Sequence, residues 1–244
     1  MTDRRTTIAE RAYVLHAQPY RETSLLLEAF CRSHGRVAMV ARGARRPRSL
    51  LRSVLLAFQP VSLAWFGKAE VRTLANAEWL GGVPLLQGEA LLCGYYLNEL
   101  MVKLLPREDS HELLFDAYQR AVGALARGEP SSPVLRGFEK ALLSELGYAI
   151  TLRCDGAGGR ELDPQASYVY DPERGPLEVS RIGRTLMAAE PILRGQTLLD
   201  IARDDYKDPQ TLAEAKLLMR ALINHRLDYQ PLSSRRVFRE LLEL

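Results

Sequence analysis

The chain has 244 residues, of which 47% are hydrophobic and 26% are charged, and its formal net charge is +3. That length allows two modest domains, each with its own core, and the composition is ordinary for a globular protein. No run of eighteen apolar residues is present, which argues against a membrane-spanning helix, and no apolar signal segment follows the polar N-terminus. The expected location is therefore cytoplasmic.

Positive charge is concentrated in the first third of the chain. Residues 1–80 hold thirteen Lys and Arg against six Asp and Glu, whereas the remainder holds twenty against twenty-four. Between Arg32 and Arg52 there are seven arginines and no acid. This imbalance indicates different partners for the two parts, and the arginine run suits phosphate groups, although a solvated basic loop has the same pattern.

Five short apolar runs in residues 1–80 predict β-strands. They are Ala9–Ala17, Ser24–Cys31, Gly35–Gly43, Gln59–Phe66 and Glu70–Leu74, separated by Gly, Pro and polar turns, with Pro19 expected to end the first. Five such strands predict a small closed barrel of OB type. Barrels of this type bind single strands through a basic groove and stacked aromatic side chains, for which the candidates are Tyr20, Phe58, Trp65 and Phe66. Core packing is the alternative for each of them.

Residues 81–244 predict an all-α domain. Together with the predicted β-barrel, this gives the fold class α+β. Helical periodicity covers residues 87–105, 109–126, 134–146, 180–190, 209–227 and 235–242. Asp109 and Ser110 are candidate caps of the second helix, and Ser233 and Ser234 of the last. Residues 148–177 are rich in Gly and Pro and are expected to be irregular.

No catalytic or metal-binding constellation is visible. The histidines lack ligand spacing, the three cysteines lie far apart, and no Walker A motif is present. Asp204, Asp205 and Asp208 precede Pro209 and are more typical of a helix cap than of a metal site. We therefore expect a protein that is not an enzyme and has no cofactor.

Several short motifs, in a fixed order, together resemble one family. They are Ala12–Leu15 with Arg21–Ser24, Gly35–Val37 with Val40–Arg45, Tyr96–Leu100, Leu135–Glu139 through Leu146–Tyr148, and Leu232–Arg235. In this combination the chain resembles the RecO family of bacterial recombinational repair proteins, over nearly its whole length. The Gly-Arg-Val and Ala-Arg-Gly-Ala-Arg segment is the most specific of these motifs.

The resemblance implies an N-terminal OB domain, here residues 1–80, and a C-terminal helical domain, here residues 81–244. It implies a recombination mediator that binds single- and double-stranded DNA and promotes strand annealing. It also implies binding to the acidic C-terminal tail of single-stranded DNA-binding protein, and partnership with RecR in loading RecA. Many members carry a four-cysteine zinc site. Here Cys154 occupies the place of the first cysteine, but Ala157 stands at the place of the second and no second pair follows, so zinc is expected to be absent.

Two sets of candidate binding residues follow from the residue pattern and the resemblance together. The DNA-binding candidates are Arg21, Arg36, Arg42, Arg45, Arg46, Arg48, Arg52, Lys68 and Arg72. For the partner tail, Arg136 would meet the carboxylates, and Leu135, Phe138 and Leu142 would form an apolar wall. Phe138 and Leu142 have core packing as their alternative.

Two other classes of protein fit the same features. One is a protein–protein adaptor whose basic face binds only acidic proteins, and the other is an OB-fold RNA-binding factor without annealing activity. An arbitrary oligonucleotide separates the adaptor from the DNA mediator, and a preference for RNA separates the RNA-binding factor.

Overall fold

The computed structural model of the chain describes residues 9–147, 152–183 and 190–242. Two compact units divide it. Unit 1 consists of Met1–Ser131 with Leu232–Leu244, and unit 2 consists of Ser132–Pro231. The predicted domain boundary at residue 80 stays a prediction. The first two long helices belong to the same compact unit as the barrel.

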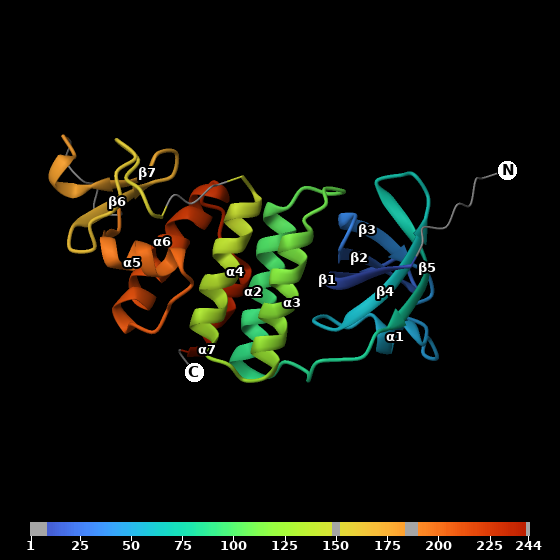
Figure 1. The fold of residues 1–244 in the computed structure, drawn as a ribbon. Coiled ribbons are helices and arrows are strands. Elements are labelled where there is room, and N and C mark those ends of the chain that lie inside the picture. Colours follow the sequence, from blue (N-terminus) through green and yellow to red (C-terminus); the bar gives the residue numbers. More distant parts are fainter. Residues whose placement is uncertain (1–8, 148–151, 184–189, 243–244) are drawn as a thin grey trace. The chain divides into compact units, whose positions relative to one another are not determined.

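A closed five-stranded barrel begins unit 1, which confirms the predicted OB-type fold (Figure 1). Its strands are β1 (Glu10–Tyr20), β2 (Ser24–Cys31), β3 (Gly35–Ala41), β4 (Pro60–Phe66) and β5 (Val71–Trp79). They follow the order β1-β2-β3-β5-β4 around the barrel. Only the β3–β5 pair is parallel, and β1 closes the barrel by pairing antiparallel with β4.

The barrel encloses a core of inward-facing side chains, including the fully buried Leu27, Met39 and Leu63. The segment between β3 and β4 contains the short helix α1 (Leu51–Val54). Ala44, near the start of this segment, and Leu55, directly after the helix, belong to the same buried core. The arginine-rich segment is therefore held against the barrel by apolar residues, and is not a loose loop.

Two strands are longer than predicted. β1 continues through Pro19, which pairs with Leu25. This is tolerated because β4 pairs only with Glu10–Tyr13, so that edge of β1 needs no backbone donor from Pro19. β5 continues from Leu74 to Trp79, since an irregularity opposite Ala64 and Trp65 resets its register against β4.

Helices α2 (Gly88–Leu104) and α3 (Glu112–Ala126) belong to the same unit as the barrel. Tyr13 of β1 lies against Phe115 and Tyr118 of α3, with ring centroids 5.6 and 5.1 Å apart. Phe30 of β2 meets Phe115 at 5.4 Å. The buried Asn98 of α2 donates to the Leu15 carbonyl at 2.8 Å and accepts from the Tyr118 hydroxyl at 2.6 Å. We call these contacts the aromatic seam.

The loop between α2 and α3 adds to this contact. The backbone N–H of Glu108 donates to the Arg36 carbonyl at 2.9 Å. Gly35 has a left-handed φ of +64°, and a Cβ at this position would lie 1.7 Å from the Asp109 carbonyl oxygen. Only glycine satisfies both conditions. The predicted cap from Asp109 or Ser110 is wrong, since α3 begins after His111, whose side chain makes no capping hydrogen bond.

Helix α7 (Ser233–Leu242) returns to unit 1 and contacts α2. The backbone N–H groups of Ser233 and Ser234 each donate to the Glu99 carboxylate at 2.8 Å. A carboxylate from α2 therefore caps this helix, in place of the predicted serine hydroxyls.

Unit 2 combines helices with a small sheet that the sequence did not predict. Its elements are α4 (Ser131–Glu145), β6 (Ser167–Asp171), β7 (Gly175–Glu178), the 3-10 helix η1 (Val179–Arg181), β8 (Ile192–Arg194), α5 (Gly195–Ala202) and α6 (Pro209–Arg226). The sheet order is β7-β6-β8. The segment predicted to be irregular, residues 148–177, thus includes most of the β6–β7 hairpin, and that prediction is wrong there. The helix predicted at 180–190 is a single 3-10 turn where it is described, and residues 148–151 and 184–189 lie outside the described residues.

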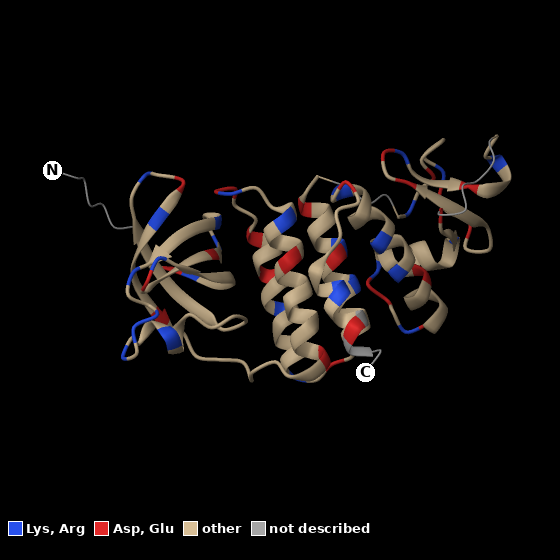
Figure 2. Cartoon of the chain, turned by 180° about the vertical axis from the view of Figure 1, so that it is seen from behind, with Lys and Arg blue, Asp and Glu red and all other residues tan. Residues whose placement is uncertain are grey.

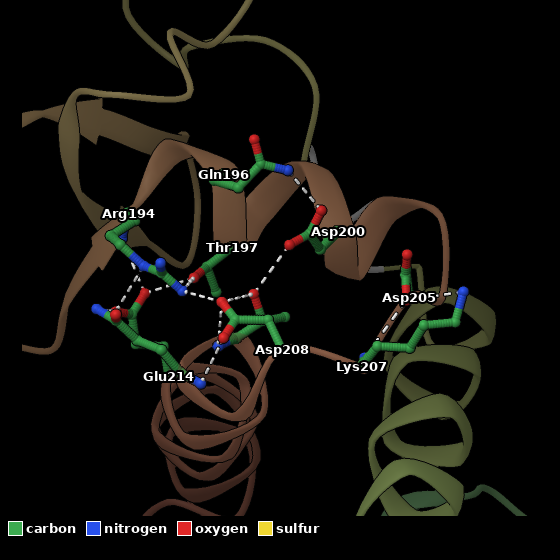
Figure 3. A network of polar contacts seen from close by, with 10 residues as sticks. Arg194, Gln196, Thr197, Asp200, Asp205, Lys207, Asp208 and Glu214 are labelled. Carbon is green, nitrogen blue, oxygen red and sulfur yellow. Dashed lines mark hydrogen bonds and ion pairs between the residues drawn. The ribbon is translucent and has the colours of Figure 1, made fainter.

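A polar network joins β8, α5 and α6 (Figure 3). Arg194 Nη2 donates to Asp208 Oδ2 at 2.7 Å, and its Nε donates to Glu214 Oε1 at 3.2 Å. Asp208 accepts from the backbone N–H groups of Gln210 and Thr211 at the start of α6. The predicted capping role of this acidic group is confirmed for Asp208.

We expect Glu99→Gln to weaken the attachment of α7 in a pH-dependent way. Burial alone would raise the pKa of Glu99, but hydrogen bonds from Ser234, Ser233 and Lys103 outweigh it and lower the pKa. A carboxyl group with a lowered folded-state pKa stabilises the protein above its unfolded-state pKa, and this stability is lost as the pH falls through the folded value. Chemical denaturation should show a deficit of about 1–2 kcal/mol in the variant at neutral pH.

The deficit should shrink as the pH is lowered beneath the ordinary glutamate value of 4.5. Glu89→Gln is the matched control, because Glu89 is exposed on the first turn of the same helix. Equal stabilities of the wild type and Glu99→Gln at neutral pH would contradict the capping role.

Candidate nucleic-acid interface

The nine predicted DNA-binding residues fall into two groups on the barrel. Leu25 at the start of β2 pairs with Ala41 at the end of β3, so the β1–β2 turn lies beside the arginine-rich segment. At this end lie Arg21, Arg42, Arg45, Arg46, Arg48 and Arg52. The other three are Arg36, near the start of β3, and Lys68 and Arg72, near the start of β5. The structure therefore brings six of the nine together.

The basic segment, defined as residues 42–52, is anchored through Arg45. Its backbone N–H donates to the Thr23 carbonyl at 2.8 Å. Its guanidinium donates to the carbonyls of Arg21 and Glu22, both at 3.3 Å. These bonds fix the start of the basic segment on the β1–β2 turn, and α1 at its other end contacts β5.

Four arginines of the basic segment form no ion pair with a described acidic side chain. Arg42, Arg46, Arg48 and Arg52 are exposed, and within the described ranges their guanidinium groups form neither an ion pair nor a hydrogen bond. Figure 2 marks the Lys and Arg positions of the barrel in blue. Guanidinium groups of this kind bind phosphate oxygens in a bidentate manner.

Arg36 and Arg72 are held in a different environment. We call this set the charge network, and it consists of Glu28, Arg36, Glu70, Arg72, Arg107 and Glu108. Ion pairs join Arg36 and Arg107 to Glu28, Arg107 to Glu70, and Arg72 to Glu108. Its three arginines are balanced by three glutamates, so it offers little net charge to a phosphate.

Arg36 is the most enclosed cation of the charge network. Its side chain is 13% exposed, Nη1 donates to Glu28 at 2.9 Å, and Nε and Nη2 both donate to the Leu105 carbonyl. Arg107 also donates a hydrogen bond to Glu28, and this bond raises the pKa of Arg107 above its ordinary value. These contacts give Arg36 a structural role. Lys68, in contrast, is exposed.

Two of the four predicted stacking aromatics are buried, and Phe66 is partly buried. Trp65 and Phe58 are each 4% exposed, which agrees with their alternative as core residues. Tyr20 is partly buried, with the Arg21 guanidinium 5.3 Å from its ring centroid. Sequence reasoning missed Trp79, which is 58% exposed at the end of β5. Only the observed extension of β5 places it on the barrel.

The four candidate tail-binding residues lie on α4 in unit 2. Phe138 and Leu142 are buried, as their core alternative predicts, and Leu135 is partly buried. Arg136 is only 7% exposed, and its Nη2 donates to Glu139 at 2.7 Å. The buried Arg136 Nε and Tyr206 hydroxyl lack a hydrogen-bond partner among the residues that the structure describes. Burial also raises the pKa of Tyr206.

The described part of the chain holds no group of three or more His, Cys, Asp or Glu side chains arranged for a metal ion. Cys31 and Cys93 are buried and form no disulfide, and Cys154 is partly buried. No helix within the described ranges is long and apolar enough to cross a membrane.

Comparisons with known proteins match the chain along almost all of its length. The family model "Recombination protein O N terminal" matches residues 5–83, and "Recombination protein O C terminal" matches residues 85–236. The chain is 56% identical over 235 residues to DNA repair protein RecO of Azoarcus sp. (strain BH72), covering 96% of both chains. It is 52% identical over 244 residues to DNA repair protein RecO of Aromatoleum aromaticum, covering all of both.

We expect Arg36→Ala to lower the free energy of unfolding by about 2 kcal/mol, because the Leu105 carbonyl and Glu28 each lose a charged donor. Chemical denaturation measures the loss. Arg48→Ala removes the same charge from an exposed site and should change the stability by no more than about 0.5 kcal/mol. A similar small change in both variants would show that Arg36 has no structural role.

Proposed function

This protein belongs to the RecO family of DNA repair proteins, and on that premise we propose that it is a recombination mediator. It binds single- and double-stranded DNA without sequence specificity and promotes the annealing of complementary strands. It is not an enzyme, needs no cofactor, and acts in the cytoplasm in association with the nucleoid.

The observation that carries this proposal is the set of exposed arginines in the basic segment that form no ion pair with any described residue. Each phosphate that such an arginine neutralises releases condensed counterions, and this release supplies most sequence-independent affinity. The basic segment contains no acid, so nothing within it repels the DNA backbone. About six phosphate contacts would lower the affinity roughly a thousandfold between 50 and 200 mM salt.

Annealing follows from the same chemistry. Two complementary strands repel one another through their phosphates, and a surface that neutralises both lowers the cost of bringing them together. A protein that anneals arbitrary strands should leave the pairing edges of the bases free. The basic segment suits this role because arginines that follow a phosphate backbone do not themselves specify a sequence.

In its partnerships, the protein binds the acidic C-terminal tail of single-stranded DNA-binding protein and acts with RecR to load RecA. Support for a tail site at Arg136 comes from its unused Nε donor and from the nearby, partly buried Leu135. The ion pair with Glu139 is the obstacle, because an incoming carboxylate must share or displace that partner.

We expect the combined variant of Arg42, Arg46, Arg48 and Arg52, each changed to Ala, to lose DNA binding. Fluorescence anisotropy with labelled single-stranded and duplex oligonucleotides at several salt concentrations measures it. Four phosphate contacts would be removed, so the slope of log affinity against log salt should fall by about four on duplex DNA.

A charge-matched control replaces four exposed cations elsewhere: Arg127, Arg174, Lys207 and Arg236. It makes the same change in net charge and should bind DNA nearly as the wild type does. Unchanged affinity in the basic-segment variant would refute the proposed surface. No retention of any oligonucleotide by the wild type would favour the adaptor, and a preference for RNA would favour the RNA-binding factor.

Removing the Arg136 side chain should abolish binding of a peptide with the acidic tail sequence. Arg136→Ala leaves Glu139 as a buried charge without its partner arginine, which would cost about 3–5 kcal/mol of stability. The double variant Arg136→Gln with Glu139→Gln removes both charges and avoids that cost. Anisotropy should show peptide binding by the wild type and none by the double variant, with DNA binding retained in both. Full peptide affinity in a folded double variant would exclude this site.

A further inference from the structure

Trp79 stands at the end of the row of β5 that faces the barrel core. It pairs across strands with Val61, and the next inward pair along the strands is Ala77 with Leu63. Val61 and Leu63 are fully buried, and Ala77 packs against the same core. Trp79 continues this row beyond the point where the barrel covers it, so the indole is 58% exposed.

The exposed indole is fixed in place. Its Nε1 donates to Gln59 Oε1 at 3.4 Å, and Gln59 Nε2 donates to the Val83 carbonyl at 3.1 Å. Gln59 is itself only 4% exposed. Gly82 lies against the six-membered ring, since a Cβ at this position would be 2.9 Å from Trp79 Cζ2. An aromatic ring held this way loses little rotamer freedom when a ligand stacks on it.

The segment next to β5 and the end of β5 itself carry positive charge and exposed apolar side chains. Helix α1, which carries Arg52, contacts β5. Leu50 and Leu56 on either side of α1 are 83% and 42% exposed, and Leu80 is 47% exposed. The acid adjacent in sequence, Glu78, occupies the alternate position on β5 and accepts from Asn76, so it belongs to the outer row of the strand.

A ligand matching these features is a polyanion that also carries flat apolar faces. Single-stranded DNA has both, because its phosphates suit the arginines and its unpaired bases stack on aromatic rings. In a duplex the base faces are covered by their neighbours, so only the phosphates remain available to the protein. The two kinds of DNA should therefore use different parts of this surface.

We propose that Trp79 is a base-stacking residue, held by Gln59 and Gly82, through which this end of the barrel distinguishes single-stranded from duplex DNA. The inference deepens the proposed DNA-binding function and rests on it. Phosphate binding by the basic segment serves both kinds of DNA, whereas stacking on Trp79 serves only unpaired bases.

The test compares wild type, Trp79→Ala and Trp79→Phe by anisotropy on an oligothymidylate and on a duplex of equal length. Trp79→Ala should weaken single-strand binding roughly 5- to 100-fold, and Trp79→Phe should weaken it less because a smaller ring remains. Duplex affinity and the salt dependence on both ligands should stay unchanged, because no phosphate contact is removed.

Tryptophan fluorescence gives an independent readout, since the chain has only two tryptophans and Trp65 is buried. Oligothymidylate should quench the wild-type emission, and the quenching should disappear in Trp79→Phe. Gly82→Ala, which pushes a Cβ against the indole, should weaken single-strand binding without removing the ring. Tyr229→Ala removes another exposed aromatic side chain, 75% exposed and located in unit 2, and should change neither ligand's affinity.

Three outcomes would overturn the inference. Wild-type affinity of Trp79→Ala for the oligothymidylate, without quenching in the wild type, shows that no base stacks there. Equal weakening on single strands and duplex shows that Trp79 only supports the basic segment. Both outcomes leave the DNA-binding function intact if the basic-segment arginines are still needed. A wild-type protein that binds no DNA refutes the proposed function and this inference together.

Discussion

Unit 1 depends on the aromatic seam, where α3 lies against the outer face of β1 and β2. Tyr13 and Phe30 point away from the barrel core, yet they are 2% and 0% exposed because Phe115 and Tyr118 cover them. Burying an aromatic side chain of this size contributes roughly 1.5–3 kcal/mol. The barrel strands alone would leave these rings in water. Helix α3 therefore contributes to the stability of the barrel, although the predicted domain boundary lies between the two.

The same contact sorts the arginines of the barrel by function. The α2–α3 loop brings Arg107 and Glu108 to the start of β3 and β5, where they complete the charge network with Arg36 and Arg72. Arginines at that end stabilise the fold. The basic segment lies at the other end of β3, and four of its arginines form no ion pair with any residue that the structure describes. Among the described residues, the ion-paired arginines thus lie at one end of β3 and the exposed arginines without an ion pair lie at the other.

The sequence predicted local patterns well and long-range partners poorly. The β2 limits were predicted to the residue and α6 to within one, because alternation and helical periodicity depend on neighbours in the chain. The burial of Trp65 and Phe58 depends on barrel closure and could not be read from their surroundings. Arg107 and Glu28 are 79 residues apart, so nothing local distinguishes Arg36 from Arg42. The β6–β7 hairpin was missed because its strands are short and flanked by Gly and Pro.

Helix α7 belongs to unit 1 but is synthesised after the whole of unit 2. Unit 2 is inserted into the sequence of unit 1, and Ser233 is separated from its acceptor Glu99 by 134 residues. At bacterial elongation rates of about 5–20 residues per second, the α7 backbone reaches Glu99 on the order of ten seconds after α2 is made. Throughout that interval Glu99 lacks its hydrogen bonds from Ser233 and Ser234, and the Tyr96 ring lacks the Arg235 guanidinium beside it. Unit 1 is thus begun first on the ribosome and finished last, after all of unit 2 has been translated.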